Sequence, residues 1–166
     1  MGYFYHKFES DPLDKLYELL EDVTPLPSDC GALCGGACCK GGGGDGMLLF
    51  PGERAFFDGR DDFMLLSDER YDCDAVVCSG SCDRSKRPLS CRIYPYFFYV
   101  SQSGSVTVEN DLRAIGRCPL TEQEYQVNKQ FLRRMRMCAK IVENDRELYG
   151  FVGRISALLT DFGPLA

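Results

Sequence analysis

The feature that most constrains this chain is a cysteine-rich stretch that runs from Cys30 to Cys91. It contains eight of the ten cysteines, and a ninth, Cys118, follows a segment with the pattern of a short hairpin. The stretch opens with CGALCGGACC and continues through a run of glycines, so it has little apolar material of its own to bury. We therefore interpret it as a metal–thiolate site around which the rest of the chain folds.

Composition and charge narrow the class of protein. The 166 residues fit one domain, and 45% hydrophobic content with 11 Phe and 9 Tyr supplies material for a core. The net charge of −6, before any thiol ionises, argues against a general nucleic-acid binder. No segment approaches the roughly 20 apolar residues that cross a bilayer. Residues 1–10 lack the pattern of a secretory signal.

These features predict a cytoplasmic location. In a reducing compartment, clustered cysteines are more often metal ligands or redox groups than structural disulfides. We expect a small irregular α+β fold: a cysteine-rich metal-binding domain with short antiparallel strands and C-terminal helices. Residues 1–166 form a single domain, with the metal-binding core at 26–120 and the helical C-terminal part at 121–161.

Periodicity predicts the individual elements. A helix over 11–22 begins at Asp11, followed by Pro12, which suits the first helical position. Residues 47–50 and 63–66 are candidate strands, with a brief helical or irregular piece between them that runs through residue 57. Residues 97–100 and 106–108 have the pattern of a hairpin.

The C-terminal part has a helical pattern. Its TEQE sequence at 121–124 follows Pro119 and is a capping box, which predicts a helix from about 122 to 149. Gly150 then interrupts the pattern before a last helix, which Gly163 and Pro164 end. The expected inward positions are Phe131, Met135, Cys138, Val142, Phe151, Val152, Ile155, Leu158 and Leu159.

Cysteine spacing is the main indication of metal binding. Sulfurs four residues apart in a tight loop can reach one ion, because Zn–S bonds of about 2.3 Å end at tetrahedral corners. This spacing occurs in Cys30, Cys34 and Cys38, and again between Cys78 and Cys82. Neighbouring side chains point apart in most backbone conformations, so Cys38 and the adjacent Cys39 would serve two ions more easily than one. The pattern therefore favours a two-centre or multinuclear arrangement.

The charge of such a site calls for nearby cations. A Zn(Cys)4 unit has a charge of −2, so two units would take the formal charge of the chain from −6 to −10. Four cations lie within the ligand-bearing segment and are candidates to orient and screen the thiolates: Arg84, Lys86, Arg87 and Arg92. The alternative for them is a solvated basic loop.

Together these residues resemble a known family. The motif C-x3-C-x3-CC, Glu53 after an apolar strand, and the later RPxxCRxYP at 87–95 are similar to the zinc- or iron-chelating cysteine-rich domain family, which is YkgJ-like and known by its CxxCxxCC signature. The resemblance covers residues 30–118. The opening spacing is looser than the signature, and DRSK at 83–86 replaces an Ile-Tyr pair.

The resemblance implies cysteine ligation of zinc or of an iron–sulfur cluster. The implied ligands are Cys30, Cys34, Cys38, Cys39, Cys82, Cys91 and Cys118. Cys73 and Cys78 compete for the remaining place or both bind, so both belong to the predicted set. Some relatives are described as flagellin lysine N-methylases. No segment has the pattern of an S-adenosylmethionine fold, so this activity transfers weakly.

Other candidate residues have simpler interpretations. Cys138 lies on an apolar helix face, where we expect it to be a buried core residue. For Glu53 we favour a structural salt bridge to Arg92 or Arg54 over metal ligation. His6, the only histidine, has a surface or packing role. The glycine run at 41–46 opens a strand and not a helix, so it does not fit a nucleotide-binding loop.

The leading hypothesis is a metal-binding protein whose folding is coupled to zinc or iron–sulfur ligation. One alternative is an iron–sulfur enzyme component of the methylase-like or redox type. Another is a dithiol redox protein that uses Cys38 and Cys39. Whether the chain is an enzyme is left open by the sequence. The expected partners are metal ions; a protein partner is left unspecified, and no membrane or nucleic-acid partner is expected.

Overall fold

The computed structural model describes residues 11–28, 31–39, 46–80, 83–122 and 125–161. The fold mixes helices with two antiparallel sheets, which confirms the α+β class. One sheet has the order β1-β3-β2, and the other is the β4–β5 hairpin. The strands are β1 (Met47–Leu48), β2 (Phe63–Asp68), β3 (Cys73–Cys78), β4 (Tyr96–Val100) and β5 (Val106–Asn110).

Within the described ranges, three α-helices are long and three are short. The long ones are α1 (Pro12–Leu20), α5 (Lys129–Asn144) and α6 (Arg146–Asp161). The short ones are α2 (Gly31–Cys34), α3 (Arg54–Phe57) and α4 (Leu89–Ile93). Short 3-10 helices cover η1 (Ala37–Cys39), η2 (Arg84–Lys86), η3 (Leu112–Ala114) and η4 (Pro119–Thr121).

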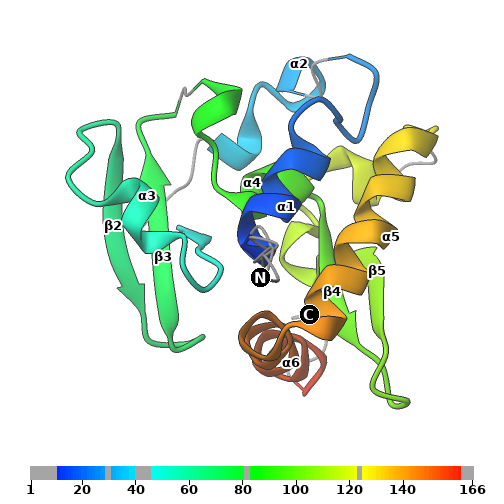
Figure 1. The fold of residues 1–166 in the computed structure, drawn as a ribbon. Helices are drawn as coiled ribbons and strands as arrows, with labels where there is room; N and C mark the ends of the chain where they lie inside the picture. Colours follow the sequence, from blue (N-terminus) through cyan, green and yellow to red (C-terminus); the bar gives the residue numbers. More distant parts are fainter. Residues whose placement is uncertain (1–10, 29–30, 40–45, 81–82, 123–124, 162–166) are drawn as a thin grey trace, which may run out of the picture.

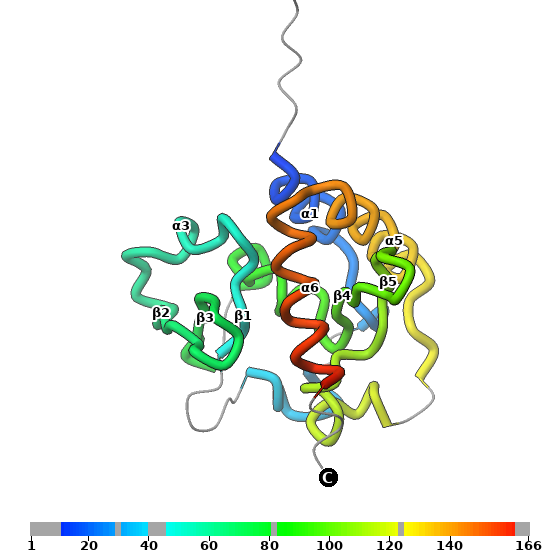
Figure 2. Tube along the Cα trace, turned by 90° about the horizontal axis from the view of Figure 1, so that it is seen from below, coloured from blue at the N-terminus to red at the C-terminus, as the bar shows by residue number. Residues whose placement is uncertain are grey.

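The two sheets lie on opposite sides of the molecule (Figures 1 and 2). Helices α1 and α4 lie between them in Figure 1, and α5 and α6 pack against the β4–β5 hairpin. The largest hydrophobic cluster joins these helices to the hairpin and includes Leu16, Phe50, Phe98, Phe131 and Phe151. The three-stranded sheet has a smaller cluster of its own, formed by Leu49, Phe57, Phe63 and Val76.

Helix α1 forms where the sequence predicts it. The carboxylate of Asp11 accepts a hydrogen bond from the Leu13 N–H at 2.9 Å, and Pro12 occupies the first helical position. Leu13, Leu16 and Leu20 are buried, so one apolar stripe of the helix faces the core.

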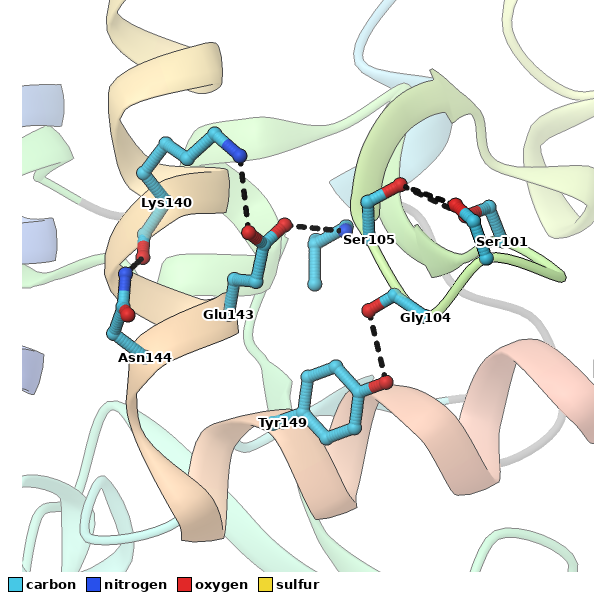
Figure 3. A network of polar contacts seen from close by, with 9 residues as sticks. Ser101, Gly104, Ser105, Lys140, Glu143, Asn144 and Tyr149 are labelled. Atoms are coloured by element: carbon cyan, nitrogen blue, oxygen red, sulfur yellow. Dashed lines mark hydrogen bonds and ion pairs between the residues drawn. The ribbon is translucent and has the colours of Figure 1, made fainter.

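The β4–β5 hairpin also matches its prediction, and residues of two helices form hydrogen bonds to its turn (Figure 3). The Glu143 carboxylate on α5 accepts a hydrogen bond from the Val106 N–H at 2.8 Å. The Tyr149 hydroxyl on α6 donates to the Gly104 carbonyl at 3.0 Å. The Lys140 ammonium nitrogen lies 3.0 Å from a carboxylate oxygen of Glu143 and orients that carboxylate. The turn of the hairpin is thus held by both C-terminal helices.

The predicted start of the C-terminal helix is wrong. Thr121 does not cap a helix, because it lies in η4 and its hydroxyl donates to the Cys118 carbonyl at 2.7 Å. Helix α5 begins after Asn128, whose side chain accepts from the Gln130 N–H at 3.0 Å. The inward positions on α5 are correct, since Phe131, Met135, Cys138 and Val142 are all buried. On the last helix the predicted inward positions are buried except Leu158, which is half-buried.

The interruption between the last two helices is also misplaced in the prediction. It occurs at Asp145, whose carboxylate accepts from the Glu147 and Leu148 N–H groups and so caps α6. Gly150 lies inside α6. The predicted stop at Gly163 and Pro164 lies outside the described residues. Within the described chain, no helix combines the length and the apolar character needed to cross a membrane.

Candidate metal centre

Four of the predicted ligands line one cavity of about 50 Å³. Cys38 and Cys39 come from η1, Cys78 ends β3, and Cys91 lies in α4. The rest of the lining is mainly apolar and consists of Met47, Phe63, Val76, Val77, Arg87 and Tyr94. Three segments that are far apart in the sequence therefore place cysteines around one space.

A second cavity, of about 20 Å³, adjoins the first. It is lined by Cys34, Cys38 and Cys118, so Cys38 belongs to both. Tyr94 also lines both cavities. Cys118 is buried and packs in a small cluster with Leu26, Ala114 and Leu120. The two cavities together bring six predicted ligands from four segments into one region.

Local backbone geometry explains how the opening loop reaches this region. Gly35 and Gly36 have φ values of 60° and 71°, which the sequence between Cys34 and Cys38 can adopt because glycine has no Cβ. The Gly36 N–H donates to the Gly31 carbonyl at 3.0 Å, and the Cys39 N–H donates to the Gly36 carbonyl at 2.8 Å. These two glycines therefore allow the tight turn that brings Cys38 and Cys39 back toward Cys34.

The sulfur atoms of Cys38 and Cys39 lie 3.9 Å apart. The expectation that these neighbouring side chains point apart is therefore wrong. Sulfurs bound to one tetrahedral zinc at about 2.3 Å are about 3.8 Å from each other, so this pair fits one edge of such a site. A disulfide would need an S–S distance of about 2.05 Å, and Cys39 is a free thiol in the structure.

The described residues do not form a complete metal site by themselves. Within the described ranges, no three His, Cys, Asp or Glu side chains are gathered closely enough to hold an ion. Two of the predicted ligands, Cys30 and Cys82, lie outside the described residues. The cavities thus identify the region that six of the predicted ligands line, and the full ligand set stays a prediction.

Strand β3 separates the two competing candidates, Cys73 and Cys78. Its side chains alternate between faces, so residues five apart lie on opposite faces and about 16 Å apart along the strand. Cys78 packs against the small sheet cluster and lines the first cavity. Cys73 packs against the main core, and burial raises the pKa of its thiol to about 11. We therefore keep Cys78 in the candidate site and remove Cys73 from it.

The predicted cations have different roles. Arg87 lines the first cavity, as expected for a group that screens thiolates. Arg84 instead donates to the carbonyls of Leu20 and Val23 at the end of α1. Arg92, with 4% of its surface exposed, donates to the Ser85 and Arg87 carbonyls. Lys86 is exposed.

The predicted salt bridge of Glu53 is wrong. Within the described chain, Glu53 pairs with neither Arg92 nor Arg54, and Arg54 pairs instead with Asp74 at 2.5 Å. Glu53 has no exposed surface and accepts hydrogen bonds from the N–H groups of Phe50 and Leu89 and from the Tyr17 hydroxyl. Burial raises the pKa of its carboxyl to about 7, although these hydrogen bonds oppose the shift.

Sequence reasoning missed two residues of the site. Tyr94 lines both cavities, and burial with the nearby Cys118 raises the pKa of its phenol, which therefore stays protonated. Arg117 lines the second cavity. The sequence contained a signal for each residue. Tyr94 belongs to the RPxxCRxYP motif. Arg117 comes directly before Cys118, and Arg87 likewise comes a few residues before Cys91.

The remaining candidates have no part in the described site. Cys138 is fully buried in the main core, as predicted, and burial raises the pKa of its thiol to about 12. His6 and most of the glycine run at 41–46 lie outside the described residues.

Comparison of the chain with models of known protein families, with curated proteins and with solved structures gave no match. The resemblance to the zinc- or iron-chelating cysteine-rich family therefore depends on the motif residues alone.

Proposed function

We propose that this chain is a metal-binding protein in which clustered cysteines hold zinc or an iron–sulfur cluster. The ligands that line the two cavities are Cys34, Cys38, Cys39, Cys78, Cys91 and Cys118. Spacing in the sequence adds Cys30 and Cys82 to this set. The resemblance to the zinc- or iron-chelating cysteine-rich family supports the same assignment.

The observation that supports the proposal most directly is the convergence of six cysteines from four separate segments on two adjoining cavities. The donor set consists of sulfur atoms, and thiolates are soft ligands that favour zinc, copper(I) and iron–sulfur clusters over magnesium or calcium. Among the described lining residues, the other polar side chains are those of Tyr94, Arg87 and Arg117, and the two arginines can offset thiolate charge. This donor set fits a thiolate-bound metal.

The sizes of the cavities are consistent with two centres. A space of about 20 Å³ accepts roughly one water-sized group, whereas about 50 Å³ accepts several. Cys38 borders both spaces, so a sulfur shared between two centres is compatible with the arrangement. When bound, the metal would supply sulfur crosslinks between segments that pack few apolar side chains of their own.

The segments that such crosslinks would join are otherwise weakly connected. Helix α2 and η1 contain no buried residue, and Cys38 is exposed. Because so little hydrophobic burial holds this loop, metal binding and the ordering of the loop should be coupled. Removal of the metal should therefore release residues 31–39 before it unfolds the helical core.

Metal analysis of the full chain tests the proposal. The protein would be purified anaerobically, and its zinc, iron and acid-labile sulfide would be measured per chain. A colourless protein with stoichiometric zinc supports a zinc site, and a brown protein with iron and sulfide supports a cluster. A folded protein with no bound metal, whose thiol count falls on mild oxidation, would contradict the proposal and favour the dithiol alternative.

Strand β3 offers a matched pair of variants for the same test. Cys78→Ser and Cys73→Ser alter the same residue type at opposite ends of one strand, and both thiols are partly buried. We expect Cys78→Ser to lower the metal content and Cys73→Ser to leave it unchanged. Equal loss in the two variants would contradict the placement of the site.

A further inference from the structure

A buried carboxylate lies beside the proposed metal site without lining either cavity. Glu53 follows β1 at the start of α3 and has 0% of its surface exposed. One oxygen accepts from the Phe50 N–H at 2.6 Å. The other accepts from the Leu89 N–H at 2.7 Å and from the Tyr17 hydroxyl. One side chain therefore joins α1, the end of β1 and the start of α4.

The bond to Leu89 determines how α4 begins. Leu89 is the first residue of this five-residue helix, and the preceding residue, Pro88, makes no side-chain cap. A helix leaves its first N–H groups without internal partners, so a buried start needs an acceptor from elsewhere. Glu53 supplies that acceptor from 36 positions earlier in the chain. The orientation of α4 thus depends on a residue outside it.

Further contacts fix the other sides of α4. The guanidinium of Arg92 lies 4.6 Å from the centre of the Tyr17 ring, and it donates to the carbonyls of Ser85 and Arg87. The Ser90 hydroxyl donates to the Leu48 carbonyl at 2.5 Å. Cys91 lies between Ser90 and Arg92, so both of its neighbours are held by buried polar contacts.

We propose that Glu53, together with Tyr17, positions Cys91 for metal binding by capping α4. This inference depends on the proposed metal-binding function, and it assigns a role to a residue that does not contact the metal. Glu53 and Tyr17 are positioning residues, whereas Cys91 is the ligand.

The chemistry of the carboxylate explains why an apolar residue or an amide would not serve. A buried carboxylate is costly, because it loses its hydration. Its two oxygens accept all three hydrogen bonds, but the single oxygen of a glutamine could not satisfy donors placed on both sides of the group. Burying the Glu53 carboxylate therefore costs free energy, but it provides an arrangement of three accepted hydrogen bonds that glutamine cannot reproduce.

The test uses Co²⁺ as the probe, because sulfur-to-cobalt charge-transfer absorption reports how many thiolates bind. We expect Glu53→Gln to weaken Co²⁺ binding about 10–100-fold, the usual range for partners of metal ligands, and to reduce the charge-transfer intensity. Tyr17→Phe removes one hydroxyl only and should give a smaller loss in the same direction. It also keeps the test informative if Glu53→Gln folds poorly.

A double-mutant cycle distinguishes positioning from general stability. If Glu53 acts through Cys91, the double variant Glu53→Gln with Cys91→Ser binds Co²⁺ no more weakly than Cys91→Ser alone. Val142→Ala is the matched control, since it removes buried volume in α5 and should lower stability without changing the cobalt spectrum.

Two results would overturn the inference. The first is a Glu53→Gln protein that is less stable but binds Co²⁺ with unchanged affinity and spectrum. The second is a double variant whose losses add in full. If the wild-type chain binds neither Co²⁺ nor zinc, the proposed function and this inference fail together. If the wild type binds Co²⁺ and Glu53→Gln binds it equally well, only this inference fails.

Discussion

Arg84 connects the ligand-bearing segment to the N-terminal helix, and its removal gives a sharp prediction about stability. Its guanidinium donates to the Leu20 carbonyl at 3.1 Å, to the Glu21 carbonyl at 3.4 Å and to the Val23 carbonyl. The Leu20 and Glu21 carbonyls lie at the C-terminal end of α1, where helix carbonyls lack internal donors, and Val23 lies two residues after the C-cap. The last turn of α1 has no basic residue of its own, so Arg84 also supplies the cation that the helix dipole favours there.

The magnitude follows from these contacts. Hydrogen bonds that involve a charged group contribute about 1.5–3 kcal/mol each when buried, and less where water can replace the donor. Arg84 is partly exposed, so we expect Arg84→Met to cost roughly 2–3 kcal/mol in total. For a chain of this length, each kcal/mol lowers Tm by about 2–4 °C, so the expected decrease is about 5–10 °C. Arg84→Lys keeps the charge but loses the planar fork, so its Tm should lie between those of the wild type and Arg84→Met.

Thermal unfolding followed by circular dichroism, at fixed metal content and with reductant, measures this decrease. Arg54→Met is the matched control, because Arg54 makes an ion pair with Asp74 and its side chain is 58% exposed. Exposed pairs contribute about 0–1 kcal/mol, so the control should change Tm by no more than a few degrees. Equal decreases in the two variants would refute the argument that Arg84 caps α1.

Three further predictions concern the core and the buried titratable groups. Phe50→Ala should cost about 3–5 kcal/mol in chemical denaturation, because Phe50 is 1% exposed and its ring lies 4.9 Å from that of Phe151; a loss below 1 kcal/mol would contradict its central place. Cys138 should resist iodoacetamide at pH 8 in the folded, metal-free protein and react after unfolding, as measured by mass spectrometry, since it is fully buried with a thiol pKa of about 12. The pKa of the Glu53 carboxyl is raised to about 7, so its contribution to stability is complete below about pH 4.5 and falls by up to about 3 kcal/mol as the pH rises through 7. The difference in unfolding free energy between wild type and Glu53→Gln should show this slope, and a difference independent of pH would contradict it.

Much of the fold could be predicted because local signals agreed with the tertiary structure. Asp11 and Pro12 mark the start of α1, and two runs rich in aromatic and β-branched residues mark the β4–β5 hairpin. The TEQE sequence misled because a capping box gives only a local preference. Thr121 instead bonds to the Cys118 carbonyl, and Asn128 provides an equally good cap a few residues later.

Strand β3 shows what cysteine-based reasoning overlooked. Cysteine spacing indicates only ligands at Cys73 and Cys78, although the residues between them, Ala75, Val76 and Val77, have strand-forming character. Once the strand is recognised, the odd spacing of Cys73 and Cys78 places them on opposite faces. The choice between them was therefore available from the sequence.

The geometry of the candidate site could be predicted only in part. Spacing identified cysteines that line the two cavities, but it could not show that Tyr94 borders both or that Arg84 binds α1. Both facts depend on how distant segments pack. The position of Glu53 illustrates the same limit, because its three hydrogen-bond donors come from three separate elements.

The two ends of β3 lie in different environments, with Cys73 against the main core and Cys78 at the first cavity. Insertion or deletion of a single residue within the strand would reverse the facing of every side chain beyond that point. Cys78 would then turn away from the cavity even though no cysteine had been replaced. Natural variants of this chain should consequently tolerate changes of residue type in the middle of β3 better than changes in its length.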